Sequence, residues 1–429
     1  MKCALPVLCL AVAPVLPAAV AIERDAAGVT MRGAGETVHV AVCGPSLLHV
    51  VAGPGDPHAA SPETPWLDQP CKAAHFDFAG GQKNATLSTS VLRVLFNLDD
   101  GRLTFQSAAG ETLQTESDRE PRRYDRVDIN GEQLYRVSER FFVDAHQALY
   151  GLGQHQNDVF NYRGTVVELA QANADIALPL VVSSNGSAIL WNTASRSWFD
   201  NRFPPELKLI ADAADAIDYY FLYGPEMDSI IHWYRELTGH VPLFGKWAYG
   251  FFQSKDRYKS AQQLLEVAAK YRAERVPLDT VVQDWFWWKC QGDPEYAESY
   301  LKPHSDVRGA LRELHEEHVH SIISVWEMMD PKSTNFNEFI RRGFIIPGTY
   351  DYDATNPAAR DAYWKMLIGP ILAQAWDGFW LDSSEPEILN GRSDAVLFEK
   401  TISLGNGARY TNVFPLLHTG GVYEHWRAS

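Results

Sequence analysis

The sequence has 429 residues, of which 46% are hydrophobic and 21% charged, and its formal net charge is -16. A chain of this length exceeds one ordinary domain and can bury a large core. The acidic balance, together with the lack of a Lys/Arg cluster with interleaved aromatics, argues against a nucleic-acid partner or an anionic membrane surface. The 13 Trp and 18 Tyr suit the binding of a neutral sugar but equally suit a large core.

The first 21 residues have the pattern of a secretory signal peptide. Lys2 precedes an apolar stretch that runs to residue 20, and the small residues Ala19 and Ala21 precede Ile22. Three prolines interrupt this stretch, which argues against the alternative, a membrane anchor. No later segment is long and apolar enough to cross a bilayer. We therefore expect cleavage after Ala21, a secreted or periplasmic protein, and no association with a membrane.

Three cysteines remain once the signal peptide is removed. An exported protein could pair Cys43 with Cys71, whereas Cys290, next to aromatic residues, could be a buried thiol. No Cys-x-x-Cys motif or His/Cys ligand spacing indicates a metal. We expect neither a metal nor another cofactor.

From residue 22 to residue 240 the sequence consists of short alternating runs separated by Gly, Pro, Asn and Asp. Such spacing is typical of a β-sandwich with antiparallel strands. The clearest runs are residues 36–42, 90–98, 133–143 and 188–192. The glycine-rich stretch 148–156 indicates a turn, with a loop that reaches into a neighbouring site as the alternative. Residues 228–237 predict an amphipathic helix, which leads into a linker.

After residue 243 the pattern changes to alternating strands and helices. This alternation predicts parallel strands joined by helical crossovers, and the fold in which it occurs most often is a (β/α)8 TIM barrel. The predicted strands are residues 247–253, 278–284, 320–326 and 378–382, and the predicted helices are residues 261–273, 307–318, 358–373 and 410–427. Because such a barrel needs eight strands, residues 243–429 are expected to form only its first half.

The predicted strands end in acidic and aromatic residues. Asp284 follows the second strand, Trp326 and Glu327 end the third, and Asp382 ends the fourth. Barrel strands bring their carboxyl ends to one face, so we expect these side chains to converge, although Asp284 could also be a helix cap or a loop acid. Carboxylates walled by aromatic rings suit a carbohydrate site.

Cleavage of a glycoside uses two carboxyl groups, which lie roughly 5 Å apart in a retaining mechanism. Asp382 is the best candidate for the nucleophile. Glu385, three residues further on, could orient a substrate hydroxyl or hold the loop, and Glu387 reads as a solvated acid beside Pro386.

Several segments resemble glycoside hydrolase family 31. Residues 376–386, Trp-Asp-Gly-Phe-Trp-Leu-Asp-Ser-Ser-Glu-Pro, are similar to the family's nucleophile segment, in which an apolar strand is followed by Asp, two variable residues and Glu-Pro. Further segments resemble the family's first three barrel strands, the helix after the nucleophile and the N-terminal sandwich. They are, in that order, residues 246–258, 281–285 and 323–326, residues 417–427, and residues 150–156 with 222–225.

The resemblance implies roles for individual residues. Asp382 would be the nucleophile that forms a glycosyl-enzyme intermediate on an α-linked sugar with retention, and Glu385 would be the supporting carboxylate of the same motif. Asp284 would bind hydroxyl groups of the non-reducing-end sugar. The other residues assigned to substrate binding are Trp285, Trp326 and Trp380.

The resemblance favours an exo-acting α-xylosidase that releases xylose from oligosaccharides such as xyloglucan fragments. An α-glucosidase or an α-glucosyltransferase is the alternative. In the family, the general acid/base Asp and a hydroxyl-binding Arg lie beyond the helix that ends here at Arg427, so the chain is expected to be truncated after its fourth barrel strand. Because a positioned acid contributes about 10² to 10⁴-fold to the rate, an inactive fragment that at most binds saccharide is a further alternative.

Overall fold

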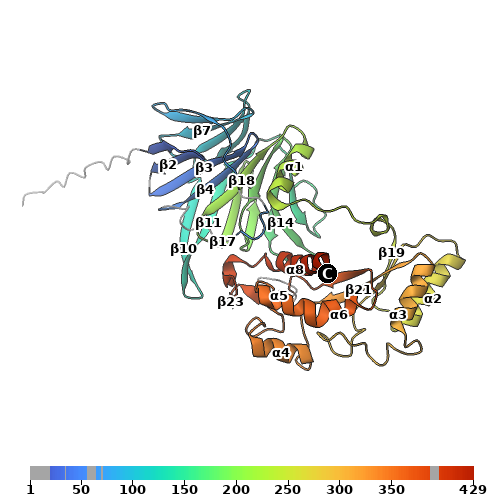
Figure 1. Cartoon of the computed structure of the whole chain (residues 1–429). Coiled ribbons are helices and arrows are strands. Elements are labelled where there is room, and N and C mark those ends of the chain that lie inside the picture. Colours follow the sequence, from blue (N-terminus) through green and yellow to red (C-terminus); the bar gives the residue numbers. More distant parts are fainter. Residues whose placement is uncertain (1–19, 34, 56–63, 69–70, 387–395) are drawn as a thin grey trace, which may run out of the picture.

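The computed structural model describes residues 20–33, 35–55, 64–68, 71–386 and 396–429 (Figure 1). Residues 1–19 of the predicted signal peptide, and Glu387, lie outside these ranges. Within the described ranges, the helices are all too short or too polar to cross a bilayer.

The N-terminal part consists of two antiparallel sheets. Short runs with alternating burial form the strands, as the sequence predicts. The first sheet has eight strands in the order β1 (Ala21–Arg24), β2 (Gly28–Gly33), β3 (Glu36–Gly44), β4 (Leu47–Pro54), β18 (Ile217–Tyr223), β15 (Ser187–Trp191), β14 (Ile176–Ser183) and β12 (Leu149–Gln154).

The second sheet has ten strands. Nine of them follow in the order β13 (Val166–Leu169), β16 (Ser197–Asp200), β17 (Glu206–Ala214), β11 (Glu132–Phe142), β9 (Thr112–Glu116), β8 (Leu103–Ser107), β7 (Leu92–Asn97), β6 (Asn84–Ser88) and β5 (Asp77–Ala79), and β10 (Arg122–Ile129) pairs with β11. Aromatic rings join the two sheets. Phe105 of β8 stacks on Phe221 of β18 with ring centroids 4.2 Å apart, and Phe141 of β11 contacts Tyr219 of β18 edge-on. The predicted β-sandwich is therefore confirmed.

The glycine-rich stretch 148–156 is mainly a strand, so its interpretation as a turn was wrong. It forms β12 at the edge of the eight-stranded sheet, with a bulge between Gly151 and Gly153. Both glycines have φ +99°, and a Cβ atom on Gly153 would lie 1.8 Å from the carbonyl oxygen of Ile176. Only glycine allows the two backbones to approach so closely, and this is why the pattern looks like a turn.

Cys43 and Cys71, whose pairing the sequence left open, form a disulfide with their Cα atoms 4.8 Å apart. Cys290 is a free, half-buried thiol.

Helix α1 (Met227–Thr238) follows the last strand of the sandwich and places Ile230 and Leu237 against it. The division of the chain at residues 240–243 stays a prediction.

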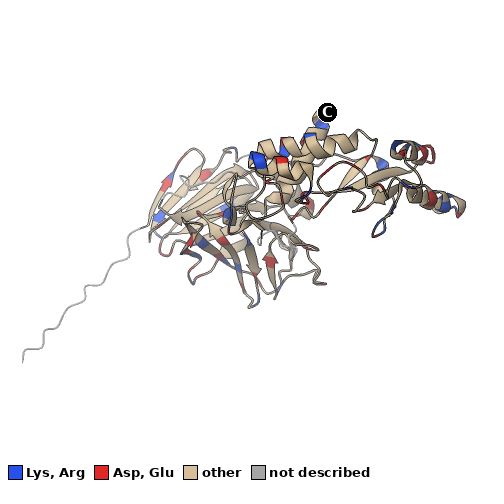
Figure 2. Cartoon of the chain, turned by 90° about the horizontal axis from the view of Figure 1, so that it is seen from below, with Lys and Arg blue, Asp and Glu red and all other residues tan. Residues whose placement is uncertain are grey.

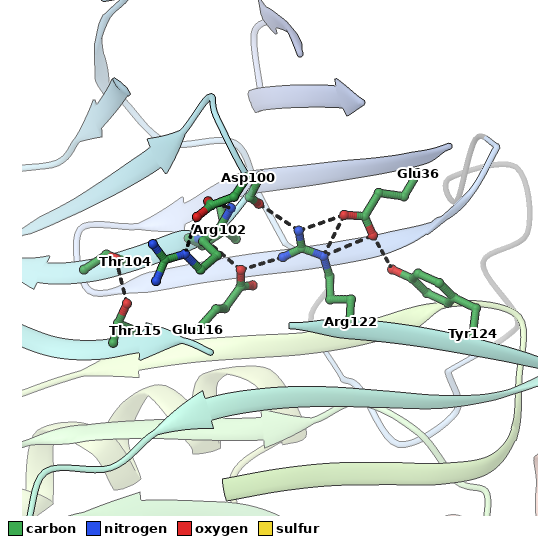
Figure 3. A network of polar contacts seen from close by, with 10 residues as sticks. Glu36, Asp100, Arg102, Thr104, Thr115, Glu116, Arg122 and Tyr124 are labelled. Carbon is green, nitrogen blue, oxygen red and sulfur yellow. Dashed lines mark hydrogen bonds and ion pairs between the residues drawn. The ribbon is translucent and has the colours of Figure 1, made fainter. Parts of the chain in front are cut away.

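Charged residues of both signs are interspersed over both parts of the molecule (Figure 2). One group of them is buried where the two sheets meet (Figure 3). Arg122 of β10, whose side chain is 1% exposed, pairs with Glu116 at 2.6 Å and with Glu36 of the other sheet at 2.9 Å. Glu139 lies buried beside them, and burial, followed by the charge of Glu116, raises the pKa of Glu139 well above its usual range.

The C-terminal part contains a parallel sheet of four strands, in the order β19 (Phe252–Gln253), β20 (Thr280–Gln283), β21 (His320–Trp326) and β22 (Gly378–Asp382) (Figure 1). This confirms the predicted first strands of a barrel. Among the described residues of this part, the helices are α2 (Ala261–Ala273), α3 (Val307–Glu316), α4 (Thr334–Arg342), α5 (Pro357–Tyr363), α6 (Gly369–Leu372) and α8 (Phe414–Ala428). Short 3-10 turns lie at Lys246–Tyr249 and Gly407–Arg409, and β23 (Thr401–Ile402) and β24 (Gly405–Asn406) form a small hairpin.

Three predicted elements differ in the structure. The first strand, predicted over 247–253, is reduced to β19, because a 3-10 turn between Gly245 and Gly250 takes up its first half. The helix predicted over 358–373 consists of α5, a π-helical turn (Trp364–Ile368) and α6, and the helix predicted to begin at residue 410 begins at Phe414. Helix α4 was not predicted.

The two parts meet at the segment before α8. The side-chain amide of Asn412 donates to the carbonyl groups of Leu169 and Ser195, and its oxygen accepts from the backbone N–H of Gln171. Arg409 pairs with Glu132 and Asp215 of the sandwich, both at 2.7 Å. The start of α8 is thereby fixed against the sandwich.

Candidate active site

Three residues that the sequence assigns to the site lie at the same edge of the parallel sheet. Asp284 directly follows β20, Trp326 ends β21 and Asp382 ends β22. Trp326 and Asp382 are direct neighbours in the strand pairing. The structure thus brings together the strand ends, because parallel strands point their carboxyl ends the same way.

Alternation along β22 decides which face Asp382 occupies. Phe379 points to the helix side, where it contacts Trp426 of α8 with ring centroids 5.2 Å apart. Trp380 lies on the opposite face and is 45% exposed. Asp382, two residues further on, shares the face of Trp380, as does Trp326 on the neighbouring strand.

The turn after β22 orients the carboxylate of Asp382. Ser383 adopts the left-handed conformation, with φ 60°, and its backbone N–H donates to Oδ1 of Asp382 at 3.0 Å. The hydroxyl group of Ser384 donates to the carbonyl oxygen of Leu381, and this hydrogen bond closes the turn after the strand. Glu385 follows in the same turn and is half-buried.

Aromatic rings line the strand ends. Trp285 stacks on Trp326 with ring centroids 5.6 Å apart and planes at 7°. The indole N–H of Trp285 donates to Asp256, and the guanidinium group of Arg257 lies 5.9 Å from the ring centre of Trp285. These contacts hold the two tryptophans in place, so that they form a flat apolar wall beside Asp284.

Asp284 is the second carboxylate at this edge. It is half-buried, and loss of solvation raises its pKa, while the backbone N–H of Trp285, which donates to Oδ1 at 2.7 Å, acts in the opposite direction. A carboxylate in such surroundings is a strong acceptor for the hydroxyl groups of a bound molecule.

The structure adds a buried pair of acids that the sequence analysis left without a role. Glu327, directly after Trp326, is fully buried, and its Oε1 accepts a hydrogen bond from the hydroxyl group of Ser383 at 3.2 Å. Asp351 is also fully buried, beside Glu327. Burial, followed by the charge of Asp351, raises the pKa of Glu327 well above its usual range, and burial raises that of Asp351 to about 6.

This pair lies under the turn that carries Asp382. Two ionised carboxylates cannot share such a buried place, so one of the two holds a proton at neutral pH. Its position at the end of an apolar strand had already placed Glu327 among the residues expected to converge with Asp284 and Asp382, but no role was assigned to it. Asp351 follows no strand, and only the tertiary structure places it here.

Two family models match the chain. Residues 37–200 match the N-terminal galactose mutarotase-like domain of glycosyl hydrolase family 31, and residues 241–429 match the TIM-barrel domain of the same family. The chain belongs to glycoside hydrolase family 31. The first range lies within the sandwich, and the second covers the part that holds the parallel sheet.

Relatives in family 31 carry several names. An alpha-xylosidase of Saccharolobus solfataricus is 32% identical over 360 residues, which are 81% of this chain and 48% of that protein. A family 31 glucosidase of Pseudescherichia vulneris, itself uncharacterised, is 27% identical over 383 residues, which are 80% of this chain and 69% of that protein. The chain thus spans about half the length of the first relative.

The fold also matches a solved family 31 structure. An alpha-xylosidase from a soil metagenome, crystallised with xylose, superposes with a TM-score of 0.83 at 23% identity, over 95% of this chain and 63% of that chain. At this level of identity the match concerns the fold of the two parts and their order.

Proposed function

We propose that the chain belongs to a retaining, exo-acting α-glycoside hydrolase, with Asp382 as the nucleophile. The observation that supports this most is the place of Asp382, at the end of β22 beside Trp326 and on the face of Trp380. A carboxylate next to exposed aromatic rings can attack the anomeric carbon of a sugar that stacks on those rings.

The other residues of the edge would position the sugar. Asp284 would accept hydrogen bonds from hydroxyl groups of the non-reducing-end sugar, and Trp285, Trp326 and Trp380 would cover its apolar face. The backbone N–H of Ser383 holds Asp382 in one orientation, and Glu385 would support the turn. In the first step a carboxylate oxygen of Asp382 bonds to the anomeric carbon while the bond to the leaving oxygen breaks, and in the second step water hydrolyses this ester. None of the described residues is assigned as the general acid that would protonate the leaving oxygen.

The sugar that we propose is α-linked xylose in an oligosaccharide, a neutral partner. The S. solfataricus relative, named an alpha-xylosidase, supports xylose, whereas the relative named a glucosidase supports glucose as the second candidate. We also propose that the protein is exported, because the signal-peptide pattern agrees with the Cys43–Cys71 disulfide.

Competing activated substrates test the sugar preference. The two substrates are 4-nitrophenyl α-xyloside and 4-nitrophenyl α-glucoside, whose leaving group needs little protonation. If the site is shaped for xylose, kcat/KM for the xyloside should exceed that for the glucoside about 10-fold or more, because the hydroxymethyl group of glucose has to be accommodated. The reverse ratio would make the protein a glucosidase. Saturable sugar binding without turnover of either substrate would indicate an inactive, saccharide-binding chain.

A further inference from the structure

Three potential metal ligands converge at the other end of the parallel strands, away from Asp382. They are His315 in the last turn of α3, His320 at the first position of β21 and Asp377 directly before β22. Nε2 of His315 lies 2.8 Å from Oδ2 of Asp377, and Nδ1 of His320 lies 3.5 Å from the same oxygen. The three ligand atoms all lie within 4.8 Å of one another.

The two distances from Asp377 to the histidines suit a tetrahedral ion such as Zn²⁺. With bonds of about 2.0–2.1 Å to nitrogen and oxygen, two ligands of a tetrahedral zinc ion lie roughly 3.3 Å apart. The two measured edges, 2.8 and 3.5 Å, lie on either side of that separation. Two imidazoles with one carboxylate favour Zn²⁺ over Mg²⁺ or Ca²⁺, which prefer oxygen ligands.

The ring of His320 supplies an independent observation. Its Nδ1 is buried, faces Asp377 and makes no hydrogen bond. A buried ring nitrogen without a partner is unfavourable, and a bound cation would satisfy it. An ordinary ion pair between His315 and Asp377 would explain those two side chains but would leave Nδ1 of His320 with no hydrogen bond and only the 3.5 Å contact to Asp377.

The surroundings hold the ligands in place, as outer groups do at metal sites. Trp247 stacks on the ring of His320 with centroids 4.4 Å apart and planes at 21°. The backbone N–H of Ser321 donates to Asp377 at 2.8 Å. The side chains of His315 and His320 are 37% and 36% exposed, so that water can reach a fourth coordination position.

We propose that His315, His320 and Asp377 form a binding site for a divalent transition-metal ion of the Zn²⁺ type, with water as the fourth ligand. The ion would join α3 to the starts of β21 and β22. Residues at this end of barrel strands serve stability, so its role would be structural. No metal was expected from the sequence, which has no Cys-x-x-Cys motif or His/Cys ligand spacing. A set in which His315 and Asp377 are 62 residues apart leaves no such pattern.

Zinc binding to the untagged 429-residue chain tests this site. The chain is stripped with a chelator and titrated with Zn²⁺ by calorimetry, and thermal unfolding is followed with and without the ion. We expect one Zn²⁺ per chain and a Tm that rises with the Zn²⁺ concentration. His315→Ala and His320→Ala should each weaken binding at least about 100-fold, since even outer groups cost 10 to 100-fold. Co²⁺ should give visible absorption that both substitutions remove.

His318→Asn is the matched control. His318 lies between the two ligands in sequence, is exposed, and has φ 54°, a conformation that Asn tolerates. This variant should bind Zn²⁺ like the wild type. Zinc binding that survives both ligand substitutions, or a Tm that does not respond to Zn²⁺, would overturn the proposal and leave an ion pair of His315 with Asp377. Circular dichroism of each variant confirms that it is folded.

Discussion

Glu327 and Asp351 place two carboxyl groups where the protein has little water to solvate them. Their charges would repel each other, and burial penalises each charge further, so protonation is favoured. The neutral partner can then donate a hydrogen bond to the ionised one. Since Glu327 also accepts from Ser383, the protonation of this pair affects the turn that orients Asp382.

The pair should make stability depend on pH. The folded-state pKa of Asp351, about 6, lies above its ordinary value of 3.8, so its contribution to stability is fully present below pH 4 and is lost as the pH rises through 6. The size of this contribution is about 3 kcal/mol. Asp351→Asn keeps the shape but cannot ionise. We therefore expect urea denaturation to show a free energy of unfolding that falls less between pH 4 and pH 8 in Asp351→Asn than in the wild type.

Asp353→Asn provides the contrast two residues away. The carboxylate of Asp353 accepts hydrogen bonds from Thr355 and from the backbone N–H of Ser403, so its charge is satisfied. The amide should therefore destabilise the protein at pH 8, whereas Asp351→Asn should leave it equally stable or more stable. An equal loss in both variants at pH 8 would show that the charge of Asp351 is satisfied too.

At the scale of elements, helices and strands with a regular hydrophobic pattern were predicted most accurately. Helix α2 and strands β21 and β22 begin and end where the sequence predicts, because each is a long or strongly apolar run with clear ends. The predicted strand 247–253 is mostly not one, since the backbone N–H of Phe251 bonds to the side chain of Asp279. Such a tertiary hydrogen bond has no local signal.

Helical breaks were predicted less well. The helix predicted over 358–373 contains Gly369 and Pro370, and Pro has no N–H to donate, so a π-helical turn separates α5 from α6. Helix α4 was not predicted, although the sequence carries signals for both of its ends. Ser333 caps it by accepting from the N–H of Phe336, and Gly343 ends it with φ 69°.

The close approach of β12 to β14 predicts that a side chain at Gly153 would destabilise this edge of the sheet. Gly153→Ala should lower the free energy of unfolding by more than about 2 kcal/mol, because the new Cβ meets the carbonyl oxygen of Ile176 in addition to the strain of the positive φ. Gly110→Ala shares the positive φ but meets open space, so its loss should be about 1–2 kcal/mol. Equal losses in urea denaturation would mean that the two strands separate easily.

At the scale of the whole molecule, the order of the parts and the sheet edge at which the candidate site residues lie were predictable. The change from short alternating strands to alternating strands and helices marks the two parts, and the apolar run before Asp382 marks a strand end. The contacts of Asn412 and Arg409, the Glu327–Asp351 pair and the group around Asp377 were not predictable in this way. Each joins residues from distant elements, which a local pattern cannot relate.

The buried charges between the two sheets give a prediction for the sandwich. Arg122→Met removes the cation that Glu116 and Glu36 share and leaves carboxylates without a partner in the interior. We expect a loss of about 3–5 kcal/mol in the free energy of unfolding, measured by urea denaturation. Arg123→Met is the control, because Arg123 is exposed and pairs with Asp125 at the surface. It should leave stability unchanged, and a similar loss in both variants would contradict the role of Arg122.

Trapping the glycosyl-enzyme tests the assignment of Asp382 most directly. With 5-fluoro-α-xylosyl fluoride, a carboxylate oxygen of the nucleophile bonds to the anomeric carbon and fluoride leaves, so no general acid is needed. The ring fluorine slows hydrolysis of the ester, which then accumulates. Peptide mapping by mass spectrometry should find one label per chain, on Asp382, and none in Asp382→Asn. A label on another residue, equal labelling of Asp382→Asn, or no label on the wild type would contradict Asp382 as the nucleophile.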